Sequence, residues 1–311
     1  MRDEFFNSLM DCAKDDDSIC LVVGDVGYSF VEPFERAFPS RFLNAGIAEQ
    51  NMVSLSAGIA LSGGKVFCYS LANFSTLRCL EQIRNDVCYH NLHVVIVSSG
   101  GGLGYGNLGI THHTTEDIAV MRALPNMTVV APGDGIEAML ATRALARWPH
   151  PSYLRISKAT KVKVYGSQPD FEIGKAIVVR QGTDVAVVST GGILETAVMT
   201  AESLLKRGVS CEVVSMHTVK PIDSNMIRSL ASRFDIIATI EEHGLIGGLG
   251  SAVSEVLAED GSRKTTLLKF GIERPFASIV GGYEYLKRYH GLTSEHISKR
   301  IIEANEKRIS T

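Results

Sequence analysis

Residues 41–71, RFLNAGIAEQNMVSLSAGIALSGGKVFCYSL, indicate the fold class of this chain. Small and apolar residues at helical spacing predict a helix over 46–62, and the apolar run that follows predicts a strand over 65–71. A buried strand is also predicted over 18–23, where it ends at Gly24-Asp25. Strand, helix and strand in succession are typical of a parallel α/β sheet.

The same alternation continues to both ends of the chain, and we expect two three-layer α/β domains with mainly parallel sheets. The segment 161–182 is polar and contains Gly166, Pro169 and Gly174, so it is predicted to be a linker between residues 1–160 and residues 183–311. The remaining predicted strands are 93–98, 127–131, 152–156, 184–190, 211–216, 235–241 and 264–270. The remaining predicted helices are 75–90, 115–123, 134–147, 193–207, 223–233, 248–259 and 293–308, and residues 5–13 also follow helical spacing.

Composition excludes several classes of protein. The 311 residues include 31 Lys and Arg against 34 Asp and Glu, so the net charge is −3 and the basic excess of a nucleic-acid binder is absent. A hydrophobic content of 45% supports a packed core, while the apolar runs are too short to span a membrane. The six cysteines form no CxxC pair, which favours reduced thiols over a metal site, and the N-terminus lacks the features of a signal peptide. We expect a cytoplasmic protein.

A glycine-rich cluster at residues 100–109 follows the strand predicted at 93–98. Its GxGxxG pattern at 104–109 is that of a dinucleotide-binding turn, but Thr111-His112-His113-Thr114 separates it from the next helix. The first strand of the chain, where that fingerprint usually lies, is followed instead by Gly24-Asp25-Val26-Gly27. A flexible loop that lines a site is therefore favoured over a nicotinamide site.

Single polar residues leave alternatives open on spacing alone. Glu49 lies in the first turn of the helix predicted over 46–62, whose other residues are mostly apolar or small. There a carboxylate either interacts with the helix dipole, slightly favoured, or shares a proton with a ligand as a partly buried acid. Of the adjacent His112 and His113, one can pack or cap while the other faces a site, and no companion spacing supports a metal site. The turn at 133–135, Gly-Asp-Gly, is interpreted as the N-cap of a helix.

Several motifs together resemble a known family. The stretches RFLNAGIAEQNMVSLSAGIALSGGKVF, FSTLRCLEQIRNDV and LGITHHTTEDIAVMRALPNMTVVAPGD resemble the pyrimidine-binding domain of transketolases. HTVKPID, TIEEHGLIGGLGSAV and YHGLTSEHI resemble the C-terminal domain, and the motifs follow the family order over nearly the whole chain. The diphosphate-binding domain with its GDG…N metal motif normally comes first, and the first strand here begins near residue 18. The resemblance therefore implies the C-terminal subunit of a split, two-subunit transketolase.

Such a subunit would act together with a partner. The resemblance implies a thiamine diphosphate cofactor at the interface, with Mg²⁺ held by an N-terminal subunit that carries the GDG…N motif. Two copies of each subunit would form an α2β2 heterotetramer. The implied reaction is transfer of a two-carbon ketol unit from a ketose-type donor to an aldehyde acceptor.

The resemblance also assigns roles around the cofactor. Glu49 matches the glutamate that bonds N1′ of the aminopyrimidine, and the shared proton activates the cofactor for attack. Phe74 matches an aromatic residue that stacks on the same ring, while Leu71 occupies the place of a second phenylalanine. Asp25 matches an aspartate at the cofactor site. With these matches the functional interpretation of Glu49 becomes the favoured one.

Four residues bear on the substrate. His112 matches a histidine that meets the substrate oxygens, and Ser29 and Lys158 lie near positions that hold the acceptor phosphate. Lys158 stands where arginine is common. It keeps the positive charge but cannot make the two parallel hydrogen bonds that a guanidinium makes to a phosphate. Leu108 replaces an aspartate that senses a sugar hydroxyl, which puts the usual sugar phosphates in doubt. Two alternatives to a ketol-transferring subunit stay open. The chain is then either the second subunit of a 2-oxo acid decarboxylating or deoxyxylulose-phosphate-synthase-like enzyme, or a non-catalytic module of the same fold.

Overall fold

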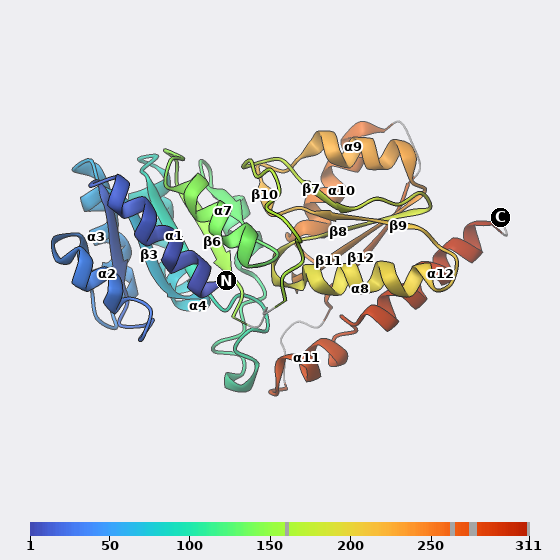
Figure 1. Cartoon of the computed structure of the whole chain (residues 1–311), viewed down its shortest axis with the longest axis horizontal. Helices are drawn as coiled ribbons and strands as arrows, with labels where there is room; N and C mark the ends of the chain where they lie inside the picture. Colours follow the sequence, from blue (N-terminus) through green and yellow to red (C-terminus); the bar gives the residue numbers. More distant parts are fainter. Residues whose placement is uncertain (159–161, 262–264, 274–278, 310–311) are drawn as a thin grey trace.

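The computed structural model describes residues 1–158, 162–261, 265–273 and 279–309. Two α/β units lie side by side, the first coloured blue to green and the second yellow to red (Figure 1). Each unit is a mainly parallel sheet between two layers of helices, so the predicted fold class is confirmed.

The first sheet has seven strands in the order β10-β5-β6-β4-β3-β1-β2. Every pairing is parallel except that of β10 with β5. The strand order reverses around β1, because β2 lies on one side of β1 and β3 on the other. The strands are β1 (Ile19–Val23), β2 (Phe42–Asn44), β3 (Lys65–Leu71), β4 (Val94–Ser99), β5 (Thr128–Val130), β6 (Ser152–Ile156) and β10 (Thr218–Lys220).

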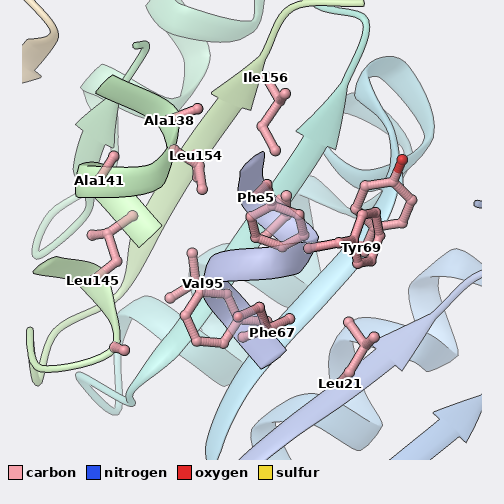
Figure 2. Close-up of a cluster of buried hydrophobic side chains, with 14 of the residues drawn as sticks. Phe5, Leu21, Phe67, Tyr69, Val95, Ala138, Ala141, Leu145, Leu154 and Ile156 are labelled. Atoms are coloured by element: carbon pink, nitrogen blue, oxygen red, sulfur yellow. The ribbon is translucent and has the colours of Figure 1, made fainter. Parts of the chain in front are cut away.

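Alternation of side chains along each strand produces two separate cores. Phe67 and Tyr69 of β3 point to one face, where they pack against Phe5 of α1 (Arg2–Asp15), and α7 (Gly135–Leu145) contributes to the same apolar cluster (Figure 2). Val66 and Cys68 of the same strand point to the other face, which is covered by α3 (Glu49–Leu61), the π-helix η3 (Ile83–Cys88) and α6 (Asp117–Ala123). Both faces are apolar, which explains why the strands are nearly continuous hydrophobic runs in the sequence.

The second sheet has five strands in the order β12-β11-β8-β9-β7, parallel except for β7 with β9. Its strands are β7 (Ile177–Arg180), β8 (Val185–Ser189), β9 (Cys211–Ser215), β11 (Ile236–Gly244) and β12 (Thr266–Ile272). One face packs against α8 (Leu194–Leu205) and α12 (Ser294–Ile309), the other against α9 (Ser224–Arg233) and α10 (Leu249–Asp260).

The short α11 (Tyr283–Tyr289) lies close to the loop that follows β4 of the first unit (Figure 1). The backbone N–H of Gly281, just before this helix, donates to the carbonyl oxygen of Gly106 at 3.3 Å. The other short elements are α2 (Glu32–Ala37), η1 (Pro39–Arg41), α4 (Ala72–Ser75), η2 (Leu77–Cys79), α5 (Leu80–Gln82), η4 (Gly106–Leu108) and η5 (Gly191–Ile193). Among the described residues, no helix has both the length and the apolar character needed to cross a lipid bilayer.

Three features depart from the sequence pattern. The segment 161–182, for which a linker is predicted, contains β7, which joins the second sheet as an antiparallel edge strand. The three-residue β10 follows β9 in the chain but completes the first sheet, where Thr218 pairs with Val130. The helix predicted over 75–90 is divided into α4, η2, α5 and η3. By contrast, Asp134 caps α7 by accepting the N–H of Glu137, as the N-cap interpretation requires.

His217 lies at the junction between the two sheets. Its ring is fully buried and stacks on Phe171 with 4.0 Å between the ring centroids, and its carbonyl oxygen accepts a hydrogen bond from the N–H of Ala131. Burial lowers the pKa of His217 to about 4, although the backbone at Lys175 and the carboxylate of Asp223 oppose the shift. The junction is therefore built around a neutral histidine.

We expect acid to weaken the fold through His217. The unfolded chain binds this proton near the ordinary pKa of 6.5, whereas the folded chain resists it down to a pKa of about 4. The free energy of unfolding should therefore fall by about 3 kcal/mol as the pH drops through that window. Urea unfolding between pH 7.5 and pH 4 would measure the loss, which His217→Gln should reduce and the exposed His296→Gln should leave unchanged. If the free energy of unfolding fell equally with pH in the parent chain, His217→Gln and His296→Gln, the assignment of this loss to His217 would be refuted.

Candidate active site

The predicted site residues gather at one edge of the first sheet. The carboxyl ends of β1, β2, β3, β4 and β6 meet there, beside the reversal of strand order, where open α/β sheets bind ligands. The residues come from the segments that follow these strands: Asp25 and Ser29 after β1, Glu49 after β2, Phe74 after Leu71 at the end of β3, His112 after β4 and Lys158 after β6.

Glu49 is the first residue of α3, and its side chain is only 2% exposed. A buried carboxylate requires a hydrogen-bonded partner, and Nη1 of Arg78 lies 2.7 Å from Glu49 Oε2. The backbone of Gly24 approaches closely from β1, since a Cβ at Gly24 would lie 3.4 Å from Cγ of Glu49 and 3.2 Å from Sδ of Met52. The helix start and this packing hold the carboxylate in place.

Arg78 is a site residue that the sequence analysis missed. It lies in η2, and its guanidinium carbon is 4.3 Å from the centroid of the Phe74 ring. The same guanidinium therefore contacts both Glu49 and the face of Phe74. Arg78 belongs to the quoted FSTLRCLEQIRNDV motif, but nothing in the sequence indicates that η2 turns its side chain back over residue 74.

An aromatic and imidazole row continues from Phe74. The ring of His112 meets Phe74 edge-on with 5.2 Å between centroids, and Tyr105 lies 6.0 Å beyond His112. Nζ of Lys158 lies 4.0 Å from the centroid of the Tyr105 ring. Partial burial, followed by the nearby His113 and Lys158, lowers the pKa of His112, so this imidazole is neutral at neutral pH.

The two adjacent histidines have different roles in the structure. His113 is buried, and its Nε2 lies 3.0 Å from the carbonyl oxygen of Gly106 inside the loop. Asn73 Nδ2 donates to the carbonyl oxygens of Thr111 and His113, which anchors the loop to α4. His113 therefore packs, while the half-buried His112 faces the site residues.

The loop after β1 has an unusual backbone. Asp25 and Ser29 adopt positive φ values of 53° and 72°, which non-glycine residues adopt rarely and which are enriched at active sites. Asn44, at the end of β2, stabilises this loop: its amide nitrogen donates to Asp25 Oδ1 at 3.0 Å, and its Oδ1 accepts the N–H groups of Asp25 and Gly46. Asn44 is thus a second residue that the sequence analysis did not single out.

A further missed residue is Arg2, at the start of α1. Its guanidinium carbon lies 4.5 Å from the centroid of the Phe30 ring, next to Ser29 in the chain. Partial burial and then the charge of Arg2 lower the pKa of Lys158. Lys158 lies at the end of the row opposite Glu49 and the positive charge of Arg2 reaches it, so this end favours an anionic group.

A buried ion pair lies behind the glycine-rich loop. Nε of Arg155 donates to Asp117 Oδ2 at 2.7 Å, and the hydroxyl of Tyr153 donates to the same oxygen at 2.5 Å. Nη2 of Arg155 also donates to the carbonyl oxygens of Thr114 and Glu242. One guanidinium therefore joins the loop that carries His112 to β11 of the second unit.

The glycines of this loop are required by close packing. A Cβ at Gly101 would lie 2.5 Å from Nε of Arg155, and one at Gly102 would lie 2.7 Å from Cβ of Glu242. A Cβ at Gly106 would lie 2.4 Å from the carbonyl oxygen of Gly281. The loop lines the site through Tyr105 and His112, and its glycines allow the two units to approach each other.

Comparison with known proteins identifies the family. Residues 1–161 match the transketolase pyrimidine-binding domain, and residues 174–297 match the transketolase C-terminal domain. The chain therefore belongs to the transketolase family, a class of enzymes that depend on thiamine diphosphate.

Individual relatives extend the match over the whole chain. A transketolase C-terminal section of Methanocaldococcus jannaschii is 38% identical and covers 99% of this chain and 96% of its own. A subunit of the apulose-4-phosphate transketolase of Phocaeicola vulgatus is 35% identical, covering 97% and 96%. A 6-deoxy-6-sulfo-D-fructose transketolase subunit of Clostridium sp. is 33% identical, covering 99% and 95%. The solved structure of a split-gene transketolase, an inactive β4 tetramer, superimposes with a TM-score of 0.88 at 32% identity and covers 97% of both chains.

The residues at the edge suit a flat cationic heterocycle. The guanidinium of Arg78 is itself a planar cation that donates a hydrogen bond to Glu49 and lies against Phe74. A ring with one protonated nitrogen at the carboxylate and one face on the aromatic side chain would make the same two contacts. The aminopyrimidine of thiamine diphosphate is a group of this kind, so the donor set fits it. The roles of the individual side chains toward that cofactor stay predictions.

We expect the buried ion pair to contribute strongly to stability. Arg155→Met leaves the Asp117 carboxylate buried without its cationic partner, and should lower the free energy of unfolding by about 3 kcal/mol. The double variant Asp117→Asn/Arg155→Met should lose less than the sum of the two single variants. Urea unfolding measures all three, with the exposed Arg207→Met as a control expected to stay within about 0.5 kcal/mol of the parent chain. Strict additivity would contradict the coupling.

Proposed function

We propose that this chain supplies the pyrimidine side of a thiamine diphosphate site in a two-subunit transketolase. The enzyme would transfer a two-carbon ketol unit from a ketose-type donor to an aldehyde acceptor. The observation that carries the proposal is that one planar guanidinium contacts both the buried Glu49 carboxylate and the face of Phe74, at the ligand-binding edge of the sheet. A partner subunit with a GDG…N motif would hold the diphosphate and Mg²⁺.

The relatives support a partner-dependent enzyme. Two of them are described as subunits of transketolases, and both match this chain from end to end. The related split-gene transketolase is inactive as a β4 tetramer, which supports the view that the second subunit alone does not make an enzyme. We infer an α2β2 assembly in which each site combines residues of both kinds of subunit.

This chain would orient the cofactor and move protons. Glu49 would hold a proton at N1′ of the aminopyrimidine, and Phe74 would fix the plane of that ring. Leu71 and Asp25 would complete this side of the site. When bound, the cofactor supplies the nucleophilic carbon that carries the two-carbon unit. His112, neutral because its pKa is lowered, would donate a hydrogen bond to a substrate oxygen or accept its proton.

The opposite end of the site favours an anionic acceptor. Lys158, Arg2 and Ser29 would bind a phosphate or a similar terminal anion. Leu108 is exposed nearby in η4 and accepts no hydrogen bond, so a donor or acceptor that lacks the usual hydroxyl at that position is favoured.

A second candidate keeps the cofactor and changes the reaction. A 1-deoxy-D-xylulose-5-phosphate synthase of Thermomicrobium roseum is 35% identical over 306 residues, and this chain spans 48% of its length. Leu108 also agrees with a donor that is not a sugar. Release of carbon dioxide from pyruvate or another 2-oxo acid, measured with the partner present, would identify this reaction.

Removal of the Glu49 charge should slow the reaction strongly. In the reconstituted two-subunit enzyme, Glu49→Gln can no longer exchange a proton at N1′ and should lower the rate of ketol transfer by at least about 100-fold. The exposed Glu81→Gln, which makes the same chemical change on the nearby α5, should keep full activity. Unchanged turnover of the Glu49 variant would overturn the proposed function.

Lys158 should determine the affinity for charged acceptors. We expect Lys158→Gln to raise the KM for a phosphorylated aldehyde about tenfold with little change in kcat, because it removes one charge-assisted contact. An uncharged short aldehyde should be used equally well by both proteins, and the exposed Lys206→Gln should behave as the parent enzyme. An equal loss with both acceptors would assign Lys158 a structural role instead.

A further inference from the structure

We propose that Arg78 is a place-holder at the cofactor site: its guanidinium occupies the position of the aminopyrimidine in the free chain and leaves when the cofactor binds. This inference rests on the proposed function, because it takes Glu49 and Phe74 as the contacts of that ring. Arg78 would then set the affinity for the cofactor without contacting the reacting atoms.

The first support is the need of Glu49 for a partner. Its carboxylate is 2% exposed, and an unpaired charge at such a position is strongly unfavourable. In the free chain, Arg78 supplies the compensating charge and a hydrogen bond of 2.7 Å. A bound aminopyrimidine would supply the same donor, so the ion pair would no longer be required.

The second support is that the two groups use the same contacts. Arg78 bonds the carboxylate with one edge and covers the ring of Phe74, 4.3 Å from its centroid. A heterocycle hydrogen-bonded to Glu49 and stacked on Phe74 would need both places. Since a planar cation and a planar ring cannot occupy one position together, binding of the cofactor requires the guanidinium to move.

The third support is that the side chain can leave without a change in the backbone. The side chain of Arg78 is 45% exposed, so its outer side already meets solvent. The chain on either side is anchored, because Thr76 and Cys79 are fully buried and Cys79 Sγ bonds the carbonyl oxygen of Phe74. The carbonyl oxygen of Arg78 also accepts a hydrogen bond from Gln50. Rotation about the side-chain bonds is therefore enough to open the site.

Competition of this kind lowers the apparent affinity for the cofactor. Only the fraction of molecules with Arg78 displaced can bind, and the dissociation constant rises in inverse proportion to that fraction. Removal of the guanidinium leaves Glu49 unpaired in the free chain, which weakens the free state and favours the bound one. The prediction is counter-intuitive for a residue in contact with Glu49: its loss should tighten binding.

The ion pair is tested first in the isolated chain. Arg78→Gln should lower the urea midpoint of unfolding, and the change should be much smaller when Glu49 is already glutamine. Arg84→Gln removes an exposed arginine six positions further along, whose guanidinium bonds Asn85, and should leave the midpoint unchanged. Equal effects of Arg78→Gln in the two backgrounds would show that the pair does not stabilise the free chain and would overturn the proposal.

The second experiment measures binding of thiamine diphosphate, with Mg²⁺, to the assembled two-subunit enzyme by titration calorimetry. Arg78→Gln should lower the dissociation constant about tenfold, as expected for release of one charge-assisted contact. Arg78→Lys keeps the positive charge but lacks the planar guanidinium, so its dissociation constant should lie between those of the parent enzyme and Arg78→Gln. Arg84→Gln should bind as the parent enzyme does.

The outcomes separate the place-holder from the function on which it rests. If Glu49→Gln weakens binding while Arg78→Gln leaves it unchanged or weakens it, the place-holder is wrong and the proposed function stands. If the parent enzyme binds no thiamine diphosphate, both are wrong. Tighter binding by Arg78→Gln and Arg78→Lys, with the larger gain for glutamine, would support both.

Discussion

A carboxylate taken out of water at the start of a helix is the constraint on which this site depends. Glu49 is held there by the first turn of α3, whose dipole supplies only a partial positive charge, and by the close approach of Gly24. The full compensating charge comes from Arg78, a partly exposed side chain. A buried carboxylate of this kind binds any flat cation that reaches it. Its buried negative charge destabilises the free chain when unpaired, and the same charge stabilises a protonated ring of a bound cofactor.

The surrounding structure fixes the position of this carboxylate relative to a row of aromatic, imidazole and cationic side chains. The row from Phe74 through His112 and Tyr105 to Lys158 crosses the edge of the sheet, and its members come from three different strand ends. Arg155 secures the loop in the middle of that row by bonding both Thr114 and the second unit. The C-terminal unit therefore contributes to the site through the backbone it supports.

The order of the strands and helices could be predicted well, because both faces of each sheet are covered and the strands are continuous apolar runs. Strands β3 and β6 coincide with their predicted ranges, 65–71 and 152–156. The two strands that the sequence pattern did not predict share a common feature. Strands β7 and β10 are short antiparallel additions whose partners, β9 and β5, lie in other parts of the chain. The local signal of each is weak, because β10 has only three residues and the short apolar run 177–179 of β7 stands beside polar residues. The break of the helix predicted at 75–90 likewise follows from packing around buried Thr76 and Cys79.

The sequence by itself determined the order of strands and helices and, through the family motifs it carries, placed Glu49, Phe74, His112 and Lys158 in the segments that follow the strands, because local patterns encode local structure. Only the tertiary structure decided how these side chains meet. The pairing of Glu49 with Arg78, the support of Asp25 by Asn44 and the contact of Arg155 with the carbonyl oxygen of Glu242 join residues 29, 19 and 87 positions apart. Such contacts depend on where the folded backbone brings distant segments together, and a one-dimensional pattern does not record that.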